Sequence, residues 1–198
     1  MTLILASTST YRRLLLQRLG LEFTVQAPAV DESAQPGESA HTLVQRLAVE
    51  KACAVALNNP SAVVIGADQL ACLDEQVLGK PGTIANAQRQ LAACSAQRVE
   101  FLTAVSVCCG AQRCVTVVDR TSVQFRELSQ QAIRTYVARE QPLDCAGAFK
   151  AEGLGIALFS SIHSDDPTAL IGLPLIKLCT LLQQFGIDPL AAGAADAG

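Results

Sequence analysis

A continuous apolar run near the middle of the chain constrains the fold more than any other feature. Residues 62–67 are rich in valine and isoleucine and end abruptly at a carboxylate, Asp68. An unbroken run of this length, without alternation, is typical of a strand that is buried on both faces. Such strands lie in parallel or mixed sheets that helices cover on both sides, so the run predicts an α/β protein.

The segments around this strand predict the same fold class. Ser9 and Ser39 stand where N-caps are preferred, ahead of a helix at 10–19 and a longer one that ends near residue 57. The other predicted elements are strands at 3–6, 22–26, 100–109, 114–125 and 156–160, a hairpin at 69–77, helices at 86–94 and 129–139, and a last helix that begins at Pro174. Strands and helices alternate early and paired strands dominate the middle, which indicates a mixed sheet with flanking helices.

The length of the chain limits its domain organisation. It has 198 residues, which is enough for one globular domain or two closely fused lobes. No repeat or linker divides the sequence, so we predict a single domain over residues 1–190, with a smaller lobe at about 125–165. Residues 191–198 are almost all small, and we predict that they form a flexible tail.

Composition excludes several classes of function. The net charge is −3 and the sequence has no basic stripe, so we do not expect a nucleic acid polymer as a partner. The apolar runs are short and the N-terminus has no basic leader, which favours a cytoplasmic protein without a membrane partner. The eight cysteines form no CxxC pair, so we expect no zinc site and reduced thiols that pack as small apolar groups. The oligomeric state, a homodimer included, is left open.

Asp68 is the strongest single candidate for chemistry. Sheets of α/β proteins place their ligands at the carboxyl ends of strands, which is where the apolar run puts this residue. A carboxylate there can act as a general base or as a metal ligand. A strand-end aspartate can equally cap a turn, and the position alone does not separate these interpretations.

A few placed cations could bind a polyanion without a basic surface. Arg12 follows Ser7 to Ser9 at the start of the first helix, where N–H groups, hydroxyls and a guanidinium favour phosphate. Lys51 shares the apolar face of the long helix, which is an unusual place for a lysine without an anionic partner. Lys80 could also neutralise phosphate oxygens, but it is not part of a P-loop, because Pro81 replaces the required Ser or Thr. The structural alternatives are an exposed helix arginine for Arg12, a helix lysine that extends to solvent for Lys51, and a turn lysine for Lys80.

The acidic pair Asp31-Glu32 completes the set of charged candidates. Its oxygens could bind a divalent cation, although acidic loop pairs are more often only solvated. Each charged residue is a weak signal alone. Together the cations, carboxylates and helix N-terminus form the set that phosphoryl chemistry with a hard metal needs.

The same residues resemble the Maf family of nucleotide pyrophosphatases. The resemblance covers nearly the whole chain and follows the order of the family's motifs. Those motifs are Leu3 to Arg13, Val30-Asp31-Glu32, Ala48 to Ala52, Gly66 to Gln69, Gly79-Lys80-Pro81, Cys145 to Gly153 and Gly172 to Leu175. One departure is Thr10, where the family usually has proline.

The resemblance implies a metal-dependent enzyme that hydrolyses a nucleoside triphosphate to a monophosphate and pyrophosphate, with Mg²⁺ or Mn²⁺ as the cofactor. It also implies an elongated α/β fold with two lobes around a cleft. Asp68 would be the catalytic base and would bind the metal with Glu32, whereas Ser7, Arg12, Lys51 and Lys80 would bind the phosphates.

The family's base-reading positions are Tyr11, Gln69 and Glu152, and they resemble the branch that acts on 7-methyl-GTP. Methylation at N7 makes guanine cationic, so Tyr11 could gain a cation–π interaction of ~1–2 kcal/mol. Glu152 could accept hydrogen bonds from the N1–H and N2–H groups of guanine. Packing of the tyrosine and solvation of the glutamate are the structural alternatives.

Two other functions compete with this hypothesis. The first is the same reaction on dTTP and UTP, whose branch typically has arginine, threonine and glutamine at the three positions. The second is a non-catalytic nucleotide-binding regulator of cell division. Asp68, Lys51 and Lys80 favour an enzyme, because binding alone needs no base.

Overall fold

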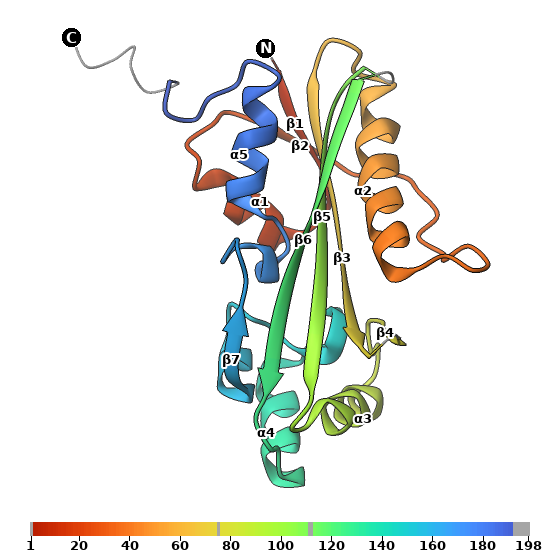
Figure 1. The fold of residues 1–198 in the computed structure, drawn as a ribbon, viewed down its shortest axis with the longest axis vertical. Helices are drawn as coiled ribbons and strands as arrows, with labels where there is room; N and C mark the ends of the chain where they lie inside the picture. The colour runs from red at the N-terminus through yellow and green to blue at the C-terminus, as the bar shows by residue number, and fades with distance from the viewer. Residues whose placement is uncertain (1, 75, 111–112, 192–198) are drawn as a thin grey trace. The chain divides into compact units, whose positions relative to one another are not determined.

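The computed structural model describes residues 2–74, 76–110 and 113–191. They form an open sheet with helices against it (Figure 1). The strands are β1 (Leu3–Ala6), β2 (Thr24–Gln26), β3 (Val63–Leu73), β4 (Gln76–Leu78), β5 (Arg98–Cys109), β6 (Arg113–Phe125) and β7 (Phe159–His163). The α-helices are α1 (Thr10–Gln17), α2 (Ala40–Ala56), α3 (Ile84–Cys94), α4 (Gln130–Glu140) and α5 (Leu175–Gln183), and three short 3-10 helices are η1 (Ala146–Ala148), η2 (Leu154–Leu158) and η3 (Ala169–Ile171).

The sheet is mixed, which confirms the predicted α/β class. Its strand order is β2-β1-β3-β5-β6-β7, and β4 pairs with β3 off this path. β1 runs parallel to both β2 and β3, whereas β3–β4 and β6–β7 are antiparallel pairs. In the part of the chain that the structure describes, no helix is both long and apolar enough to cross a membrane.

The chain divides into two compact units. The first comprises Met1–Asp68, Thr103–Asp119 and Asp166–Gly198, and the second comprises Gln69–Leu102 and Arg120–Asp165. Strands β3, β5 and β6 contribute residues to both units. The segment predicted as a smaller lobe, 125–165, falls within the second unit, and the predicted tail lies outside the described residues except for Ala191.

Apolar side chains cover both faces of the sheet in the first unit. On one face Leu5 and Ile65 pack with the buried side chains of α1 and α5, among them Leu16 and Leu178. On the other face Val64 packs with Val55 and its neighbours on α2. The alternation along β3 therefore places helices on both sides, as the unbroken apolar run predicted.

Helix α2 packs unusually close to β3 at Gly66. A Cβ built at this glycine would meet the Ala48 carbonyl oxygen and would lie 2.6 Å from the Ala52 nitrogen, both on the backbone of α2. Only glycine allows this approach without a shift of helix or strand. The approach brings the side chains of α2 within reach of the residues that follow Gly66.

An aromatic cluster organises the second unit. Phe101, Phe125, Phe149 and Phe159 pack edge to face, with ring centroids 4.9 to 6.2 Å apart. Edge-to-face contacts add to the free energy of burying the rings. The cluster fixes Phe149 and with it the start of the loop that carries Glu152.

Three sequence predictions are corrected by the structure. β3 does not end at Asp68 but continues to Leu73, so this residue lies within a long strand. The last strand begins at Phe159 and not at Ile156, because residues 154–158 form η2 and the strand pairs with β6. Finally, two cysteines are not reduced. The hairpin of β5 and β6 brings Cys108 and Cys114 together as a disulfide.

Candidate functional site

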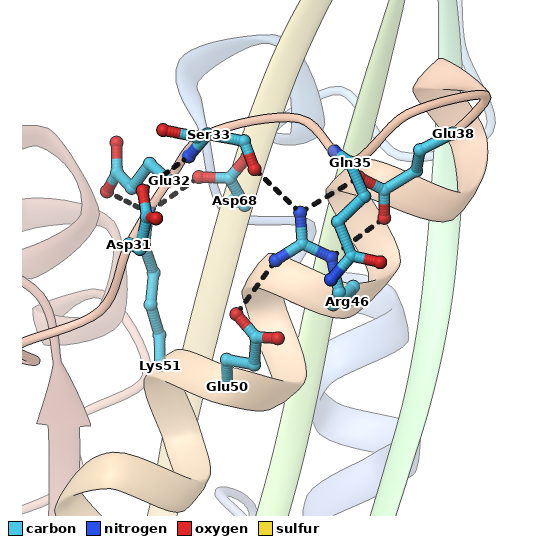
Figure 2. Close-up of polar contacts among 9 residues, drawn as sticks. All are labelled: Asp31, Glu32, Ser33, Gln35, Glu38, Arg46, Glu50, Lys51 and Asp68. Carbon is cyan, nitrogen blue, oxygen red and sulfur yellow. Dashed lines mark hydrogen bonds and ion pairs between the residues drawn. The ribbon is translucent and has the colours of Figure 1, made fainter.

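Three charged side chains converge in the first unit (Figure 2). The Lys51 Nζ lies 2.6 Å from Oε1 of Glu32 and 2.7 Å from Oδ1 of Asp68. The Lys51 and Asp68 side chains are only 7% and 10% exposed, whereas that of Glu32 is 54% exposed. Lys51, which the sequence placed on an apolar helix face, thus has anionic partners, and one of them, Glu32, is exposed to solvent.

The backbone explains why these three residues meet. Lys51 and Ala52 lie on the face of α2 that Gly66 allows to approach β3, and Asp68 is two residues further along that strand. Glu32 comes from the loop between β2 and α2, and the Lys51 side chain extends from the helix toward this loop (Figure 2). Asp31, which precedes Glu32, accepts a hydrogen bond from the Ser33 N–H at 2.9 Å and so shapes the loop around Glu32.

Arg12 adds a second cation near the same carboxylates. Its guanidinium donates from Nε to the Gly172 carbonyl oxygen at 2.9 Å. Burial lowers the pKa of Arg12, and the charges of Asp68 and Glu32 raise it. An arginine stays protonated in proteins even when its pKa is lowered, so the site keeps this positive charge.

The segment that carries Gly172 is held by a buried carboxylate. Asp166 accepts hydrogen bonds from the backbone N–H and the hydroxyl of Thr168, and from the N–H groups of Ile176 and Lys177 in the first turn of α5. The negative charge at a helix N-terminus is favourable. This network fixes the carbonyl that orients Arg12.

Ser7 lies where β1 turns into α1. Its hydroxyl oxygen accepts a hydrogen bond from the Ser9 N–H at 3.1 Å, and Ser9 in turn caps α1 by accepting from the Arg12 N–H. Ala6 pairs with Gly66 across the parallel strands, so the C-terminal end of β1 lies beside the part of β3 that leads to Asp68. The predicted helix N-terminus and carboxylate therefore belong to one unit.

Arg46 fastens the loop that carries Glu32, and sequence analysis missed it. Its guanidinium binds Glu38 through two nitrogens at 2.7 and 2.8 Å, Glu50 at 3.0 Å and the Ser33 carbonyl oxygen at 3.0 Å (Figure 2). Arg46 lowers the pKa of Glu38 to about 2. Only the Glu50 contact, at i+4 on one helix, has a signature in the sequence.

Replacement of Arg46 should lower the activity indirectly, through the loop that carries Glu32. We expect Arg46→Met to lower kcat/KM by about tenfold, because small misplacements of a reacting group are costly. The concentration of Mg²⁺ needed for half-maximal activity should rise, since the loop orients Glu32. Arg46→Lys should rescue little, because lysine cannot bind bidentately. Steady-state assays across Mg²⁺ concentrations measure this, with exposed Arg134→Met as the matched control. Unchanged metal dependence would remove Arg46 from this role.

The other predicted site residues lie elsewhere in the chain. Tyr11 is half-buried in the first turn of α1, in the first unit. Gln69 follows Asp68 on β3 and is the first residue assigned to the second unit. Lys80 is exposed after β4, and Glu152 is exposed in the turn before η2, both in the second unit.

The turn that carries Glu152 is held by residues around it. The Lys150 N–H donates to the Tyr136 hydroxyl at 2.9 Å, and its Nζ donates to the Glu140 carbonyl oxygen at 2.8 Å. The Glu140 carboxylate accepts from the Leu154 N–H at 3.1 Å. Glu152 is therefore an exposed carboxylate on an anchored turn.

Another ion pair in the first unit was also missed. The Asp119 side chain is fully buried, and its Oδ2 lies 2.6 Å from the Lys177 Nζ on α5. Asp119 ends the part of β6 that belongs to the first unit. The only sign of this ion pair in the sequence was a charged residue, Asp119, within a strand of alternating apolar residues.

The carboxylates of Glu32 and Asp68 fit a divalent cation. Both approach a single cationic nitrogen, which marks a point where positive charge is favoured. Carboxylate oxygens suit Mg²⁺ and Mn²⁺, and Mg²⁺ is often held by only one or two carboxylates together with substrate phosphates. The donor set is thus chemically suited to the metal that the resemblance implied.

Comparison with known proteins gives one consistent result. The sequence model of the family described as Maf-like protein matches residues 2–185. A protein of Xanthomonas axonopodis pv. citri, named 7-methyl-GTP pyrophosphatase, is 57% identical over 94% of this chain and 97% of its own length. A protein of the same name from Bordetella pertussis is 51% identical over 98% of this chain and 96% of its own length.

A solved structure supports the fold alone. The HAM1 protein of Coxiella burnetii superposes with a TM-score of 0.52 at 15% identity, and the match covers 93% of this chain and all of that one. At this identity the likeness extends to the architecture of the sheet and helices.

Proposed function

Because the chain belongs to the Maf-like protein family, we propose that it is a nucleoside triphosphate pyrophosphatase that hydrolyses 7-methyl-GTP to 7-methyl-GMP and diphosphate. The observation that carries the proposal is the contact of Lys51 with both Glu32 and Asp68. Relatives that are 51% and 57% identical over nearly their whole length bear the name of this activity.

Asp68 is the proposed general base. Its carboxylate accepts a proton from a water molecule, whose oxygen forms a bond to the α-phosphorus. The bond between that phosphorus and the bridging oxygen breaks, and the electron pair leaves with diphosphate. Lys51 supports this role by orienting Oδ1 of Asp68 at 2.7 Å, so the second carboxylate oxygen can serve the water.

The cations stabilise the charge that develops on the phosphates. Arg12, Lys51 and the N–H groups at the start of α1 provide positive potential in the first unit, with Ser7 at the same turn. The resemblance adds Lys80 to this set. A divalent cation bound by Glu32 and Asp68, Mg²⁺ or Mn²⁺, would supply further neutralisation of phosphate charge.

Three residues are proposed to select the base. Tyr11 would stack on the cationic methylated ring, and Glu152 would accept from its N1–H and N2–H groups. Gln69 stands beside the catalytic Asp68 on β3 and is the third position. The biological role that follows is the removal of modified nucleotides in the cytoplasm before they enter nucleic acid.

Exchange of the selecting residues should change the preferred substrate. We expect Glu152→Gln alone to lower kcat/KM for 7-methyl-GTP about 10- to 100-fold, the effect of losing a charge-assisted contact of ~1.5–3 kcal/mol. The double variant Tyr11→Arg with Glu152→Gln should gain activity on UTP or dTTP. Diphosphate release from 7-methyl-GTP, GTP, UTP and dTTP measures both effects, and exposed Glu127→Gln is the matched control.

Each outcome of this panel has a defined meaning. Preference of the wild type for UTP or dTTP would overturn the substrate and leave the pyrophosphatase activity standing. Fixed ratios among the four substrates in both variants would show that Tyr11 and Glu152 are only structural. Absence of diphosphate release from every triphosphate would favour a non-catalytic regulator.

A further inference from the structure

Three cysteines from different elements meet in the apolar core beside α2. Cys53 lies on α2, Cys108 is the last residue but one of β5 and Cys114 is the second residue of β6, and all three belong to the first unit. Cys108 and Cys114 form a disulfide, whereas Cys53 carries a free thiol. The Cys53 Sγ lies 3.5 Å from the Cys114 Sγ and 4.0 Å from the Cys108 Sγ. A thiol is therefore in contact with both sulfurs of a disulfide.

The two distances distinguish the sulfurs of the disulfide. A disulfide exchanges when a thiolate attacks one of its sulfurs and the other leaves as a thiolate. Cys114 presents the nearer sulfur to Cys53. Attack on Cys114 makes Cys108 the leaving group.

A hydroxyl relay favours the same direction. The Thr116 hydroxyl donates to the Ser106 hydroxyl at 2.9 Å, which leaves the Ser106 hydrogen for its other neighbour, the Cys108 Sγ at 3.6 Å. A sulfur in a disulfide has no hydrogen, so Ser106 must be the donor in this contact. A donated hydrogen bond stabilises a thiolate, and a more stable thiolate leaves faster.

We propose that Cys53, Cys108 and Cys114 form a thiol–disulfide exchange centre. The Cys53 thiolate attacks the Cys114 Sγ, the Cys53–Cys114 bond forms as the Cys108–Cys114 bond breaks, and the electron pair leaves on the Cys108 sulfur. Cys108 ends with the proton that Cys53 lost. One disulfide replaces another, so the step consumes no oxidant or reductant.

The exchange changes what the disulfide connects. The Cys108–Cys114 bond spans 6 residues of a hairpin, whereas Cys53 and Cys114 are 61 residues apart. The new bond joins α2, which carries Lys51, to β6. A cross-link that closes a longer loop restricts the unfolded chain more, so this isomer should resist unfolding better.

Variants in which a single cysteine is replaced by serine test the exchange centre directly. Wild type, Cys53→Ser, Cys108→Ser and Cys179→Ser are incubated with oxidised glutathione in mildly alkaline buffer, quenched in acid and digested with pepsin. Mass spectrometry then identifies the disulfide-linked peptides. We expect Cys108→Ser to form the Cys53–Cys114 bond and wild type to contain both isomers. Cys53→Ser should contain only Cys108–Cys114. Cys179, a half-buried free thiol on α5, is the matched control and should behave as wild type.

Thermal unfolding gives a second readout. Oxidation of Cys108→Ser should raise its Tm relative to the same variant under dithiothreitol, since the 61-residue loop is then closed. Two free thiols at Cys53 and Cys114 in oxidised Cys108→Ser would overturn the proposal. So would a wild type in which every Cys53 is free while Cys108 and Cys114 are bonded. Both outcomes leave the pyrophosphatase proposal untouched.

Discussion

Asp68→Asn should lower kcat by about 100-fold or more with little effect on folding. The substitution preserves the shape of the side chain, and its amide oxygen can still accept from Lys51, but it cannot take a proton from water. The position is 10% exposed and lies within β3, so the isosteric change should be tolerated. Diphosphate release at saturating 7-methyl-GTP measures kcat, and thermal unfolding confirms the fold.

The matched control is Asp165→Asn, an exposed aspartate of the second unit, which should retain wild-type turnover. Turnover near the wild-type value in Asp68→Asn would remove this residue from the mechanism. Loss of activity together with loss of folding would instead assign Asp68 a structural part, as the partner of Lys51.

Lys51→Ala should lower kcat/KM for every triphosphate by the same factor, about 100- to 1,000-fold. The expected size is that of removing one preorganised electrostatic contact, ~2.7–4 kcal/mol. The factor should be uniform because phosphates carry no information about the base. Lys80→Ala should also act uniformly, and comparison of the two variants on 7-methyl-GTP, GTP and UTP measures this. A loss confined to one base would contradict the assignment to the phosphates.

The stability of Lys51→Ala needs its own control. Without the lysine, the buried carboxylate of Asp68 loses its ion-pair partner beside Glu32 and keeps Arg12 as a nearby cation. Breaking a buried pair costs up to ~3–5 kcal/mol. The double variant Lys51→Ala with Asp68→Asn should recover much of that loss, because the buried charge is gone. A double-mutant cycle on the free energy of unfolding measures the coupling. A loss of stability in the double variant equal to the sum of the two single losses would show that the pair contributes no net coupling.

Some of the fold follows from local sequence patterns. The limits of β1 were predicted as the structure has them, and α2 was predicted within one residue at its end, because Ser39 caps the helix that the apolar pattern continues. The buried character of Val64 and Ile65 on opposite faces of the sheet was also predicted. These features depend on residues that are close in sequence, so local chemistry specifies them.

Other features depend on partners that are distant in sequence. Asp68 and Gln69 interrupt the apolar run, and β3 continues through them only because neighbouring strands satisfy its backbone. The place of β7 is set by its pairing with β6, including a register shift at Phe125. Neither the continuation of β3 nor the position of β7 has a signal in its own segment, because the pairing of a strand depends on the strand beside it.

The sequence by itself determined the α/β class, the long helix and the presence of a lysine on the apolar face of that helix. Each of these follows from the spacing of apolar residues and from local helix caps. Only the tertiary structure decided that Lys51 lies between Glu32 and Asp68, that Arg46 holds the Glu32 loop, and that Cys53 touches a disulfide. For Lys51 and Asp68 the physical reason is the close approach of α2 to β3 at Gly66. Contacts between side chains that are tens of residues apart depend on how two backbones pack, and no local pattern specifies that distance.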